Sequence, residues 1–449
     1  MSGFDNMGLA PSILAALASR GFTEPTPIQT RAIPQVMQGR DLMGLARTGT
    51  GKTAAFGLPL LHRLHALGHP PAPRTVRALI LAPTRELVGQ IAEHLELFTR
   101  GTAVRVTTVT GGASVHRQAE RLARGADILV ATPGRLIDLL ERRAVSLDHA
   151  GYLVLDEADQ MLDMGFIHAL RRIARHIPQK RQTLMFSATM PKAIEDLAAT
   201  WLRDPVRVAV DPPGRPAERI DQAVHFTTQG DKAKLLESYL VNHPGESALV
   251  FCRTKHGADK LAKLLASWGF SAGAIHGNRS QNQRDRMLAE FRAGTLKVLV
   301  ATDVAARGID IPLVRHVYNH DLPNVPENYV HRIGRTARAG AAGRAVAFCA
   351  PAEMEELRAI ERLLGAALPV AGGVPHDAGA VKAAAAERAR KPAAGRGKPP
   401  RAGAKPGSKA AAPTGGNPQK GRGDSSGRSR AAPGGGAVPT RRARRRRDA

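Results

Sequence analysis

Eight residues near the N-terminus have the spacing of a phosphate-binding loop. They read Ala46-Arg47-Thr48-Gly49-Thr50-Gly51-Lys52-Thr53 and follow a short stretch at 41–45 that is apolar after Asp41. Glycines let backbone N–H groups surround phosphate oxygens at a helix N-terminus, where the helix dipole also favours an anion. In this pattern Lys52 reaches the β- and γ-phosphates and Thr53 binds Mg²⁺. The strict pattern begins with glycine, and position 46 is alanine, so a chance Gly/Thr-rich turn is the alternative at this point.

A group of acidic residues follows another apolar run. Asp156-Glu157-Ala158-Asp159 comes directly after 152–155. An acid at the end of an apolar strand, downstream of a phosphate-binding loop, is placed to hold Mg²⁺, which is the role expected for Asp156. Glu157 could orient or deprotonate the attacking water. Such a group alone is more often a solvated strand end, but together the two motifs favour nucleoside triphosphate hydrolysis.

The segments that must position these residues form two blocks of typical domain size. In the first block, apolar runs of strand length occur at 78–82, 127–131, 152–155 and 182–186. In the second block they occur at 248–252, 272–275, 297–301 and 345–348. Continuous apolarity indicates strands that are covered on both faces, as in a parallel sheet, and longer helical patterns separate them. The predicted fold class is therefore α/β, with ligands at the carboxyl ends of the strands.

Further motifs occur in order along both blocks. They lie at 21–29, with the aromatic Phe4 upstream, and at 83–87, 111–112, 132–135, 187–189, 250–254, 280–284, 301–303, 307–310 and 331–338. With Asp156-Glu157-Ala158-Asp159, this set resembles the DEAD-box RNA helicases over about Phe4 to Cys349. The phosphate-binding loops of that family usually begin with alanine, so Ala46 agrees with the resemblance.

The resemblance implies two tandem RecA-like parallel-sheet domains, the core of helicase superfamily 2. The expected boundaries are 1–210 for the ATP-binding domain, with its Q motif at 3–31, 211–219 for the linker and 220–370 for the C-terminal helicase domain. Residues 371–449 are expected to form a disordered basic tail.

The resemblance also assigns roles at the ATP site. Phe4 would stack on adenine, and Gln29 would pair with the N6 and N7 atoms of the base. ATP contacts are further expected from each residue of 46–53, from Gly308 and from Asp310, which resembles a ribose-contacting residue. The expected catalytic residues are Lys52, Asp156, Glu157, Arg335 and Arg338, and the expected Mg²⁺ ligands are Thr53 and Asp156, partly through water. Arg335 and Arg338 would act as arginine fingers supplied by the second domain.

RNA contacts and coupling residues complete the implied site. The RNA contacts are expected from Pro83, Thr84, Arg85, Gly111, Gly112, Thr132, Pro133, Gly134, Arg135, Arg253, Gln281, Arg284 and Thr302. Coupling of hydrolysis to unwinding is expected from Ser187, Ala188, Thr189, Asp159 and His331. For any single Arg the plain alternative is a surface salt bridge, and for His331 it is a core histidine.

The implied function is RNA-stimulated ATP hydrolysis coupled to domain closure, local duplex unwinding and remodelling of RNA–protein particles. ATP and RNA would bind cooperatively, because each favours the closed state that the other prefers. An alternative is an ATP-gated RNA clamp or annealing chaperone. A DNA-translocating helicase is disfavoured by the Q motif and the Asp-Glu-Ala-Asp spelling.

Charge divides the chain unevenly. The net charge is +26, and residues 371–449 hold 19 Lys/Arg against four Asp/Glu, with no Leu, Ile, Met or aromatic residue. Such a segment cannot bury enough apolar surface to offset chain entropy. We expect it to be a sequence-independent RNA anchor, with a solvated linker as the alternative. The short core, the Arg/Gly/Ala/Pro-rich tail and the lack of an expected folded RNA-binding module after Ala371 make the chain most similar to the bacterial RhlE-type members.

Composition narrows the location and the partners. No apolar run approaches the roughly 20 residues that span a bilayer, and the N-terminus lacks the pattern of a signal peptide. Cys252 and Cys349 lie in apolar runs and are expected to be buried, reduced thiols. We therefore expect a cytoplasmic protein that uses ATP and Mg²⁺ and acts on structured RNA. Ribosomal precursor particles and RNA-decay machinery are both plausible partners.

Overall fold

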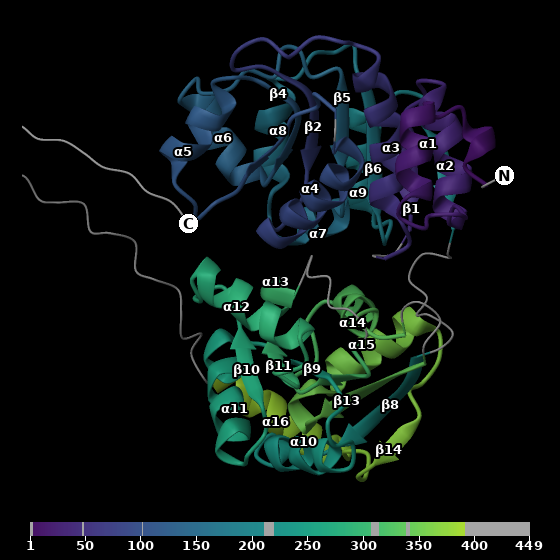
Figure 1. Cartoon of the computed structure of the whole chain (residues 1–449). Coiled ribbons are helices and arrows are strands. Elements are labelled where there is room, and N and C mark those ends of the chain that lie inside the picture. Colours follow the sequence, from purple (N-terminus) through teal and green to yellow (C-terminus); the bar gives the residue numbers. More distant parts are fainter. Residues whose placement is uncertain are drawn as a thin grey trace, which may run out of the picture. The chain divides into compact units, whose positions relative to one another are not determined.

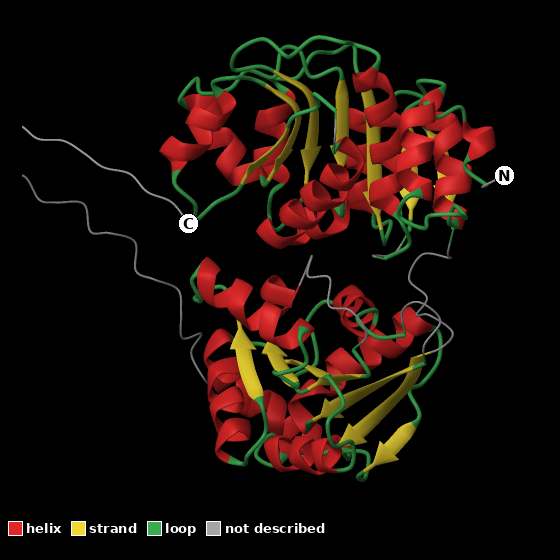
Figure 2. Cartoon of the chain, viewed as in Figure 1, coloured by secondary structure: helices red, strands yellow, loops and turns green. Residues whose placement is uncertain are grey.

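The computed structural model describes residues 3–46, 49–100, 102–210, 220–306, 314–337 and 342–390. The predictions for Arg47, Thr48, Gly308, Asp310 and Arg338 lie outside these residues, as do those for the linker at 211–219 and the tail beyond 390. We call residues 3–210 the first lobe and residues 220–390 the second lobe (Figures 1 and 2).

The first lobe contains one parallel sheet in the order β3-β4-β2-β5-β6-β1-β7. Its strands are β1 (Leu42–Leu45), β2 (Val76–Leu81), β3 (Val106–Val109), β4 (Ala126–Ala131), β5 (Tyr152–Leu155), β6 (Gln182–Ser187) and β7 (Val206–Ala209). Strands β4, β5 and β6 are buried throughout, as their continuous apolarity predicts. Motifs that are far apart in the sequence therefore lie along the carboxyl edge of one sheet.

Helices cover both faces of this sheet (Figure 2). One face packs against η1 (Asp5–Met7), α1 (Pro11–Ala18), α2 (Pro27–Met37), α3 (Lys52–His65) and α4 (Arg85–Thr99). The other packs against α5 (Val115–Leu122), α6 (Pro133–Glu141), α7 (Ala158–Asp163), α8 (Ile167–Ala174) and α9 (Lys192–Trp201). Each face of the sheet thus has its own hydrophobic core. Alternate residues of β2 pack into these two cores, Ile80 into the first and Leu79 into the second.

The second lobe repeats the topology, with the order β10-β11-β9-β12-β13-β8-β14. Its strands are β8 (Ile220–Phe226), β9 (Ala248–Phe251), β10 (Ala272–Ile275), β11 (Val298–Ala301), β12 (His316–Asn319), β13 (Gly343–Cys349) and β14 (Val370–Gly372). Its helices are α10 (Lys232–Val241), α11 (Lys255–Ser267), α12 (Gln281–Arg292), α13 (Asp303–Ala306), α14 (Pro326–Ile333), η2 (Pro351–Glu353), α15 (Met354–Leu364) and α16 (Ala378–Arg390). The prediction of two tandem parallel-sheet α/β domains is confirmed.

The predicted start of the disordered tail at 371 is wrong for residues 371–390. Strand β14 pairs with β8 through backbone atoms, which requires no apolar side chains. His376 then contacts the Cys349 carbonyl oxygen at 2.9 Å and meets the Phe226 ring edge-on. The alanine-rich α16 follows, and alanine has the highest helix propensity. The low hydrophobicity of residues 371–390 therefore led to a prediction of disorder, although the segment contains part of an edge strand and a helix.

A smaller prediction, on the two cysteines, is confirmed within the described residues. Cys252 and Cys349 are buried free thiols, and burial raises the pKa of Cys349 to about 12. Among the helices that the structure describes, none has the length and apolarity needed to cross a membrane.

Candidate ATP and RNA site

The strand order of the first lobe divides its predicted motifs into two groups. The loops after β1, β5 and β6 carry 46–53, 156–159 and 187–189, and these strands are neighbours in the sheet. The loops after β2, β3 and β4 carry 83–87, 111–112 and 132–135, and these strands are also neighbours. We call the first group the ATP half and the second the RNA half.

The phosphate-binding loop enters α3 through two glycines in the left-handed region. Gly49 has φ of 86° and Gly51 has φ of 93°, conformations that residues with a side chain rarely adopt. A Cβ atom on Gly51 would also lie 2.4 Å from Gln29 Nε2. Lys52 is the first residue of α3, so the unpaired N–H groups of the helix start there.

Lys52 and Asp156 form the buried charged centre of the ATP half. Their side chains are 6% and 3% exposed, and Lys52 Nζ lies 3.6 Å from Asp156 Oδ1. Lys52 Nζ makes no hydrogen bond to the described residues. Burial raises the pKa of Asp156 to about 6, with Lys52 opposing the shift and Glu157 adding to it. A buried ammonium without a hydrogen bond fits a phosphate ligand, and a buried carboxylate with a raised pKa fits a cation.

Glu157 turns the chain from β5 into α7 through a left-handed backbone, with φ of 52° and ψ of 52°. Its N–H donates to Asp156 Oδ1 at 3.0 Å, and the residue is 2% exposed. Left-handed backbone in a non-glycine residue costs of order 1 kcal/mol and tends to occur at functional sites. The turn places two carboxylates side by side at the end of one strand.

Asp159 links this turn to the loop after β6. Its Oδ2 accepts hydrogen bonds from Ala188 N at 3.0 Å and from Thr189 N and Oγ1 at 2.9 Å each. His331 Nε2 lies 3.7 Å from the same oxygen. Burial acts to raise the pKa of Asp159, but His331, Lys52 and the Thr189 hydrogen bonds outweigh it and leave that pKa lowered. The structure therefore brings together four predicted coupling residues.

Ser187, the fifth of these residues, stabilises the same loop. Its hydroxyl donates to the Thr189 carbonyl oxygen at 2.7 Å, and its side chain is buried. The loop conformation that presents Thr189 to Asp159 is thus fixed from within.

Gln29 is joined to the phosphate-binding loop. Its Oε1 accepts from Thr26 N at 3.0 Å in a capping box at the start of α2, and its Nε2 donates to the Gly51 carbonyl oxygen at 3.1 Å. The position agrees with a residue that senses the nucleotide, and its role as adenine reader stays a prediction.

Phe4 does not lie as predicted. It is 1% exposed and belongs to the core that η1, α1 and α2 form with the sheet. A ring with so little exposed surface offers no face on which adenine could stack. The prediction is wrong for this arrangement, since apolar packing competes for the same ring.

In the RNA half, Arg85 lies against a glycine pair. A Cβ on Gly112, whose φ is +76°, would lie 1.9 Å from Arg85 Nη1, and one on Gly111 would lie 3.3 Å from Nη2. Burial and nearby Arg284 lower the pKa of Arg85. Only glycine leaves room here for the guanidinium, so this pair positions Arg85.

Helix N-termini supply the remaining predicted contacts of the RNA half. Thr84 caps α4 by accepting from Leu87 N at 3.3 Å, and Pro83 precedes it. Thr132 precedes α6, with Pro133 and Gly134 in the first turn, and Arg135 Nη1 donates to the Ala113 carbonyl oxygen at 2.8 Å. Helix N-termini favour anions such as backbone phosphates.

The predicted RNA residues of the second lobe have protein partners. Arg253 Nη2 contacts Leu322 O at 3.0 Å and Glu353 Oε1 at 3.2 Å. Arg284 Nη2 pairs with Glu86 Oε1 at 2.9 Å, and Gln281 Oε1 accepts from Arg85 Nη1 at 3.3 Å. Thr302 is buried just before α13. RNA would therefore have to compete with carboxylates for some of these groups.

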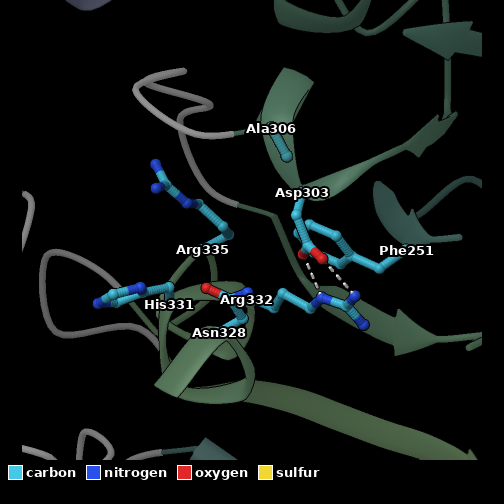
Figure 3. Close-up of a pocket in the computed structure, with 7 residues that line it drawn as sticks. All are labelled: Phe251, Asp303, Ala306, Asn328, His331, Arg332 and Arg335. Atoms are coloured by element: carbon cyan, nitrogen blue, oxygen red, sulfur yellow. Dashed lines mark hydrogen bonds and ion pairs between the residues drawn. The ribbon is translucent and has the colours of Figure 1, made fainter. Parts of the chain in front are cut away.

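Sequence reasoning missed an ion pair beside the predicted fingers. Arg332 binds Asp303 through two contacts, Nε–Oδ1 at 2.5 Å and Nη2–Oδ2 at 2.8 Å. In Figure 3, Arg335 and His331 extend away from this pair. Arg335 is 3% exposed at the end of α14. Arg332 thus fastens α14 to α13. The one sequence feature that could have indicated this role is the place of Arg332 within the motif at 331–338.

A buried network behind Arg253 was also missed. Glu353 accepts from Lys232 Nζ at 2.5 Å and from the backbone N–H groups of Leu322 and Ala350 at 3.1 Å. Lys232 Nζ also lies 3.6 Å from Asp321 Oδ1. These residues lie up to 121 positions apart, so no local pattern could reveal them.

Comparison with known proteins agrees with this geometry. Residues 26–197 match the DEAD/DEAH box helicase family and residues 231–340 match the helicase conserved C-terminal domain. The chain is 45% identical over 361 residues to the ATP-dependent RNA helicase CshA of Listeria monocytogenes, covering 80% of this chain and 68% of that protein. CshA of Streptococcus pneumoniae shows the same identity and coverage over 360 residues.

Solved structures show the same fold. S. cerevisiae Dbp5 bound to RNA and ADP BeF3 matches with a TM-score of 0.72 and 31% identity, covering 82% of this chain and 95% of that one. Mss116p bound to ssRNA and AMP-PNP matches with a TM-score of 0.74 and 28% identity, covering 84% and 79%.

The chain belongs to the DEAD-box helicase family. It is an ATP-dependent RNA helicase with a RecA-like core, and it uses ATP and binds RNA.

Proposed function

We propose that the ATP half performs the chemistry of this helicase and that the RNA half grips one strand. Lys52 binds the β- and γ-phosphates, while Thr53 and Asp156 hold Mg²⁺, partly through water. When bound, the metal neutralises charge on the phosphates. Glu157 orients the attacking water. The observation that carries this assignment is the buried Lys52 ammonium, which makes no hydrogen bond within the described part of the chain and lies 3.6 Å from Asp156.

Hydrolysis requires groups from the second lobe. Arg335 and Arg338 act as arginine fingers that stabilise charge on the transferred phosphoryl group. Asp159 reports the state of the nucleotide to Thr189 and His331, because its Oδ2 contacts both residues. ATP and RNA each favour the state in which these groups are complete, so they bind cooperatively.

The grip is independent of sequence. Helix N-termini, the glycine pair at 111–112 and Arg85 offer N–H donors to a phosphate backbone, and none of these donors is shaped to read a base. Holding one strand in a path that differs from A-form geometry separates it from its partner. Contacts to 2′-hydroxyls would distinguish RNA from DNA.

Strand displacement tests this function. A short labelled RNA duplex should separate when ATP and Mg²⁺ are present, and ATPase activity should rise with RNA more than with DNA of equal length. Thr189→Val should retain most RNA-stimulated hydrolysis but abolish displacement, because it removes one hydrogen bond to Asp159. An equal fall in both activities would contradict the coupling role.

The second candidate function is ATP-gated clamping or strand annealing. The strongly basic segment 393–449, with 15 Lys/Arg against two Asp/Glu, favours it because such a segment screens repulsion between strands. An annealing assay with and without ATP, alongside strand displacement, separates the two functions. Natural targets within this proposal include ribosomal precursor particles and RNA undergoing decay.

A further inference from the structure

A cluster of potential metal ligands lies in the second lobe at the opposite edge of the sheet from the predicted RNA contacts. His243 follows α10, Glu246 precedes β9 and His316 is the first residue of β12. Strands β9 and β12 are parallel neighbours, with His316 paired opposite Ala248. Arg253 and the other predicted RNA contacts follow the carboxyl ends of the strands, so the cluster plays no part in the proposed chemistry.

The three side chains converge. The rings of His243 and His316 stack with centroids 4.3 Å apart and planes 29° apart. His316 Nε2 contacts Glu246 Oε2. One ligand atom from each residue lies within 4.8 Å of the other two.

His316 is poorly satisfied as a simple core histidine. Its side chain is 8% exposed, and its Nδ1 has no hydrogen-bond partner among the residues that the structure describes. Burial lowers the pKa of His316, and the neutral ring is the form that binds metals. A histidine–glutamate ion pair needs only one imidazole, and the His243 imidazole adds a third potential ligand atom to that pair.

We propose that His243, Glu246 and His316 bind one divalent transition-metal ion of the Zn²⁺ type, with water at the fourth position. Two imidazoles and one carboxylate suit Zn²⁺, and a three-ligand set leaves one position open. In a tetrahedral site with bonds of about 2.1 Å, ligand atoms lie roughly 3.4 Å apart. The widest separation must therefore close by at most roughly 1.4 Å, whereas the contact between His316 Nε2 and Glu246 Oε2 must open to admit the ion.

The surroundings allow this closure. Glu246 is exposed and His243 is half-buried, so both side chains can adjust around the buried His316. The carbonyl groups at the end of α10 favour a cation nearby. Arg315 and Arg344 oppose a cation, but Arg344 lies 3.7 Å from Asp221 and is partly neutralised. The ion would fasten the α10–β9 connection to β12.

The other cluster of this kind is a poorer candidate. Cys252, His320 and Asp321 also offer ligand atoms within 4.8 Å of one another. Burial strongly raises the pKa of the Cys252 thiol, so the thiolate that metals require is disfavoured. Asp321 is also engaged by His320 and Lys232.

Cobalt binding to the chelator-treated full chain tests the proposal. Co²⁺ should bind at one equivalent per chain and produce the visible absorption of a tetrahedral site, and Zn²⁺ should abolish that absorption. His243→Ala, Glu246→Gln and His316→Ala should each weaken Co²⁺ binding by about 100-fold or more, since changing even an outer partner of a metal site costs 10- to 100-fold. Zn²⁺ should raise the Tm of wild type more than that of these variants.

The matched control is His116→Ala. His116 pairs with Glu120 at 3.4 Å on an exposed helix face without a second histidine, so this variant should bind Co²⁺ as wild type does. If His316→Ala fails to fold, the variants at His243 and Glu246 decide. Absence of the absorption in wild type, or equal Co²⁺ affinity in wild type and these variants, would overturn the proposal and leave an ion pair only. RNA-stimulated ATPase activity in Mg²⁺ should be unchanged in His243→Ala, which separates this test from that of the proposed function.

Discussion

The ATP half and the RNA half occupy one edge of one sheet but use different kinds of groups. In the ATP half, Lys52, Asp156, Glu157 and Asp159 are charged and at most 6% exposed. In the RNA half, helix N-termini and glycines dominate, and Arg85 is a half-buried cation held against Gly112.

This difference fits the roles that we propose for the two halves. Phosphoryl transfer is accelerated by fixed charges in a site from which water is excluded, so its groups are buried in advance. A strand that is gripped and released can be held by many modest contacts, such as those of helix N-termini and a half-buried arginine. Changes in the ATP half should therefore act on turnover, and changes in the RNA half on the RNA concentration that turnover requires.

The largest effect is expected from Glu157→Gln. Removing the carboxylate that we propose to position or deprotonate water should lower RNA-stimulated kcat by about 10²- to 10⁴-fold, while ATP still binds. Steady-state ATPase assays at saturating RNA measure this change. Glu93→Gln, an exposed position on α4, is the matched control and should behave as wild type. Turnover near the wild-type rate in Glu157→Gln would overturn its role.

A smaller effect on the ATP half is expected from pH. Because the pKa of Asp156 is raised to about 6, its carboxyl becomes protonated as pH falls through that value, and a protonated carboxyl is a poor Mg²⁺ ligand. With Mg²⁺ in excess, kcat/KM for ATP should be level above pH 7 and fall about tenfold per pH unit well below 6. If kcat/KM for ATP stays level down to pH 5, protonation of Asp156 does not control the binding of Mg²⁺ and ATP.

In the RNA half, Gly112→Ala should displace Arg85 and leave chemistry intact. The new Cβ would meet the guanidinium at 1.9 Å, so Arg85 could no longer pair with a phosphate from its present position. We expect the half-saturating RNA concentration to rise by about tenfold, corresponding to the removal of a charged hydrogen bond of about 1.5 kcal/mol. Gly89→Ala in α4, where a Cβ meets nothing within 4 Å, is the control. A fall in kcat without a change in RNA requirement would erase the distinction between the halves.

The smallest effect on turnover is expected from removing residues 393–449. The maximal ATPase rate should stay near wild type, while the half-saturating RNA concentration rises at low salt. The slope of log affinity against log salt should fall by about 0.7 for each phosphate that the segment neutralises in the full chain. Ending the chain after Val370 instead also removes most of β14 and all of α16, so it should lower the Tm as well. Identical salt slopes would show that the segment does not bind RNA.

Much of this architecture could be predicted because it depends on local signals. Continuous apolar runs marked the buried strands β4, β5 and β6, and glycines or acids marked the loops that follow β1 and β5. Strand β3 was not predicted, because its central residues are threonines at a sheet edge. Strand β8 was not predicted, because polar residues alternate with apolar ones along it. Both strands are only partly buried, so their sequences lack the continuous apolarity that is typical of a strand covered on both faces.

Other features depend on contacts between distant residues. The Glu353 network, the Arg332–Asp303 pair and the His243–Glu246–His316 cluster each join segments that no spacing rule connects. Phe4 was misjudged because sequence cannot show that packing with η1 and α1 covers its ring. The residues at 371–390 were misjudged because backbone pairing and alanine helicity leave no hydrophobic signal.

RNA affinity of Glu157→Gln, measured with and without ATP, tests the central claim most directly. If the ATP half gates the grip and hydrolysis only ends it, this variant should bind single-stranded RNA more tightly with ATP than without, and the complex should persist. By reciprocity, RNA should raise its ATP affinity by the same factor. Equal RNA affinity in the presence and absence of ATP would contradict the account.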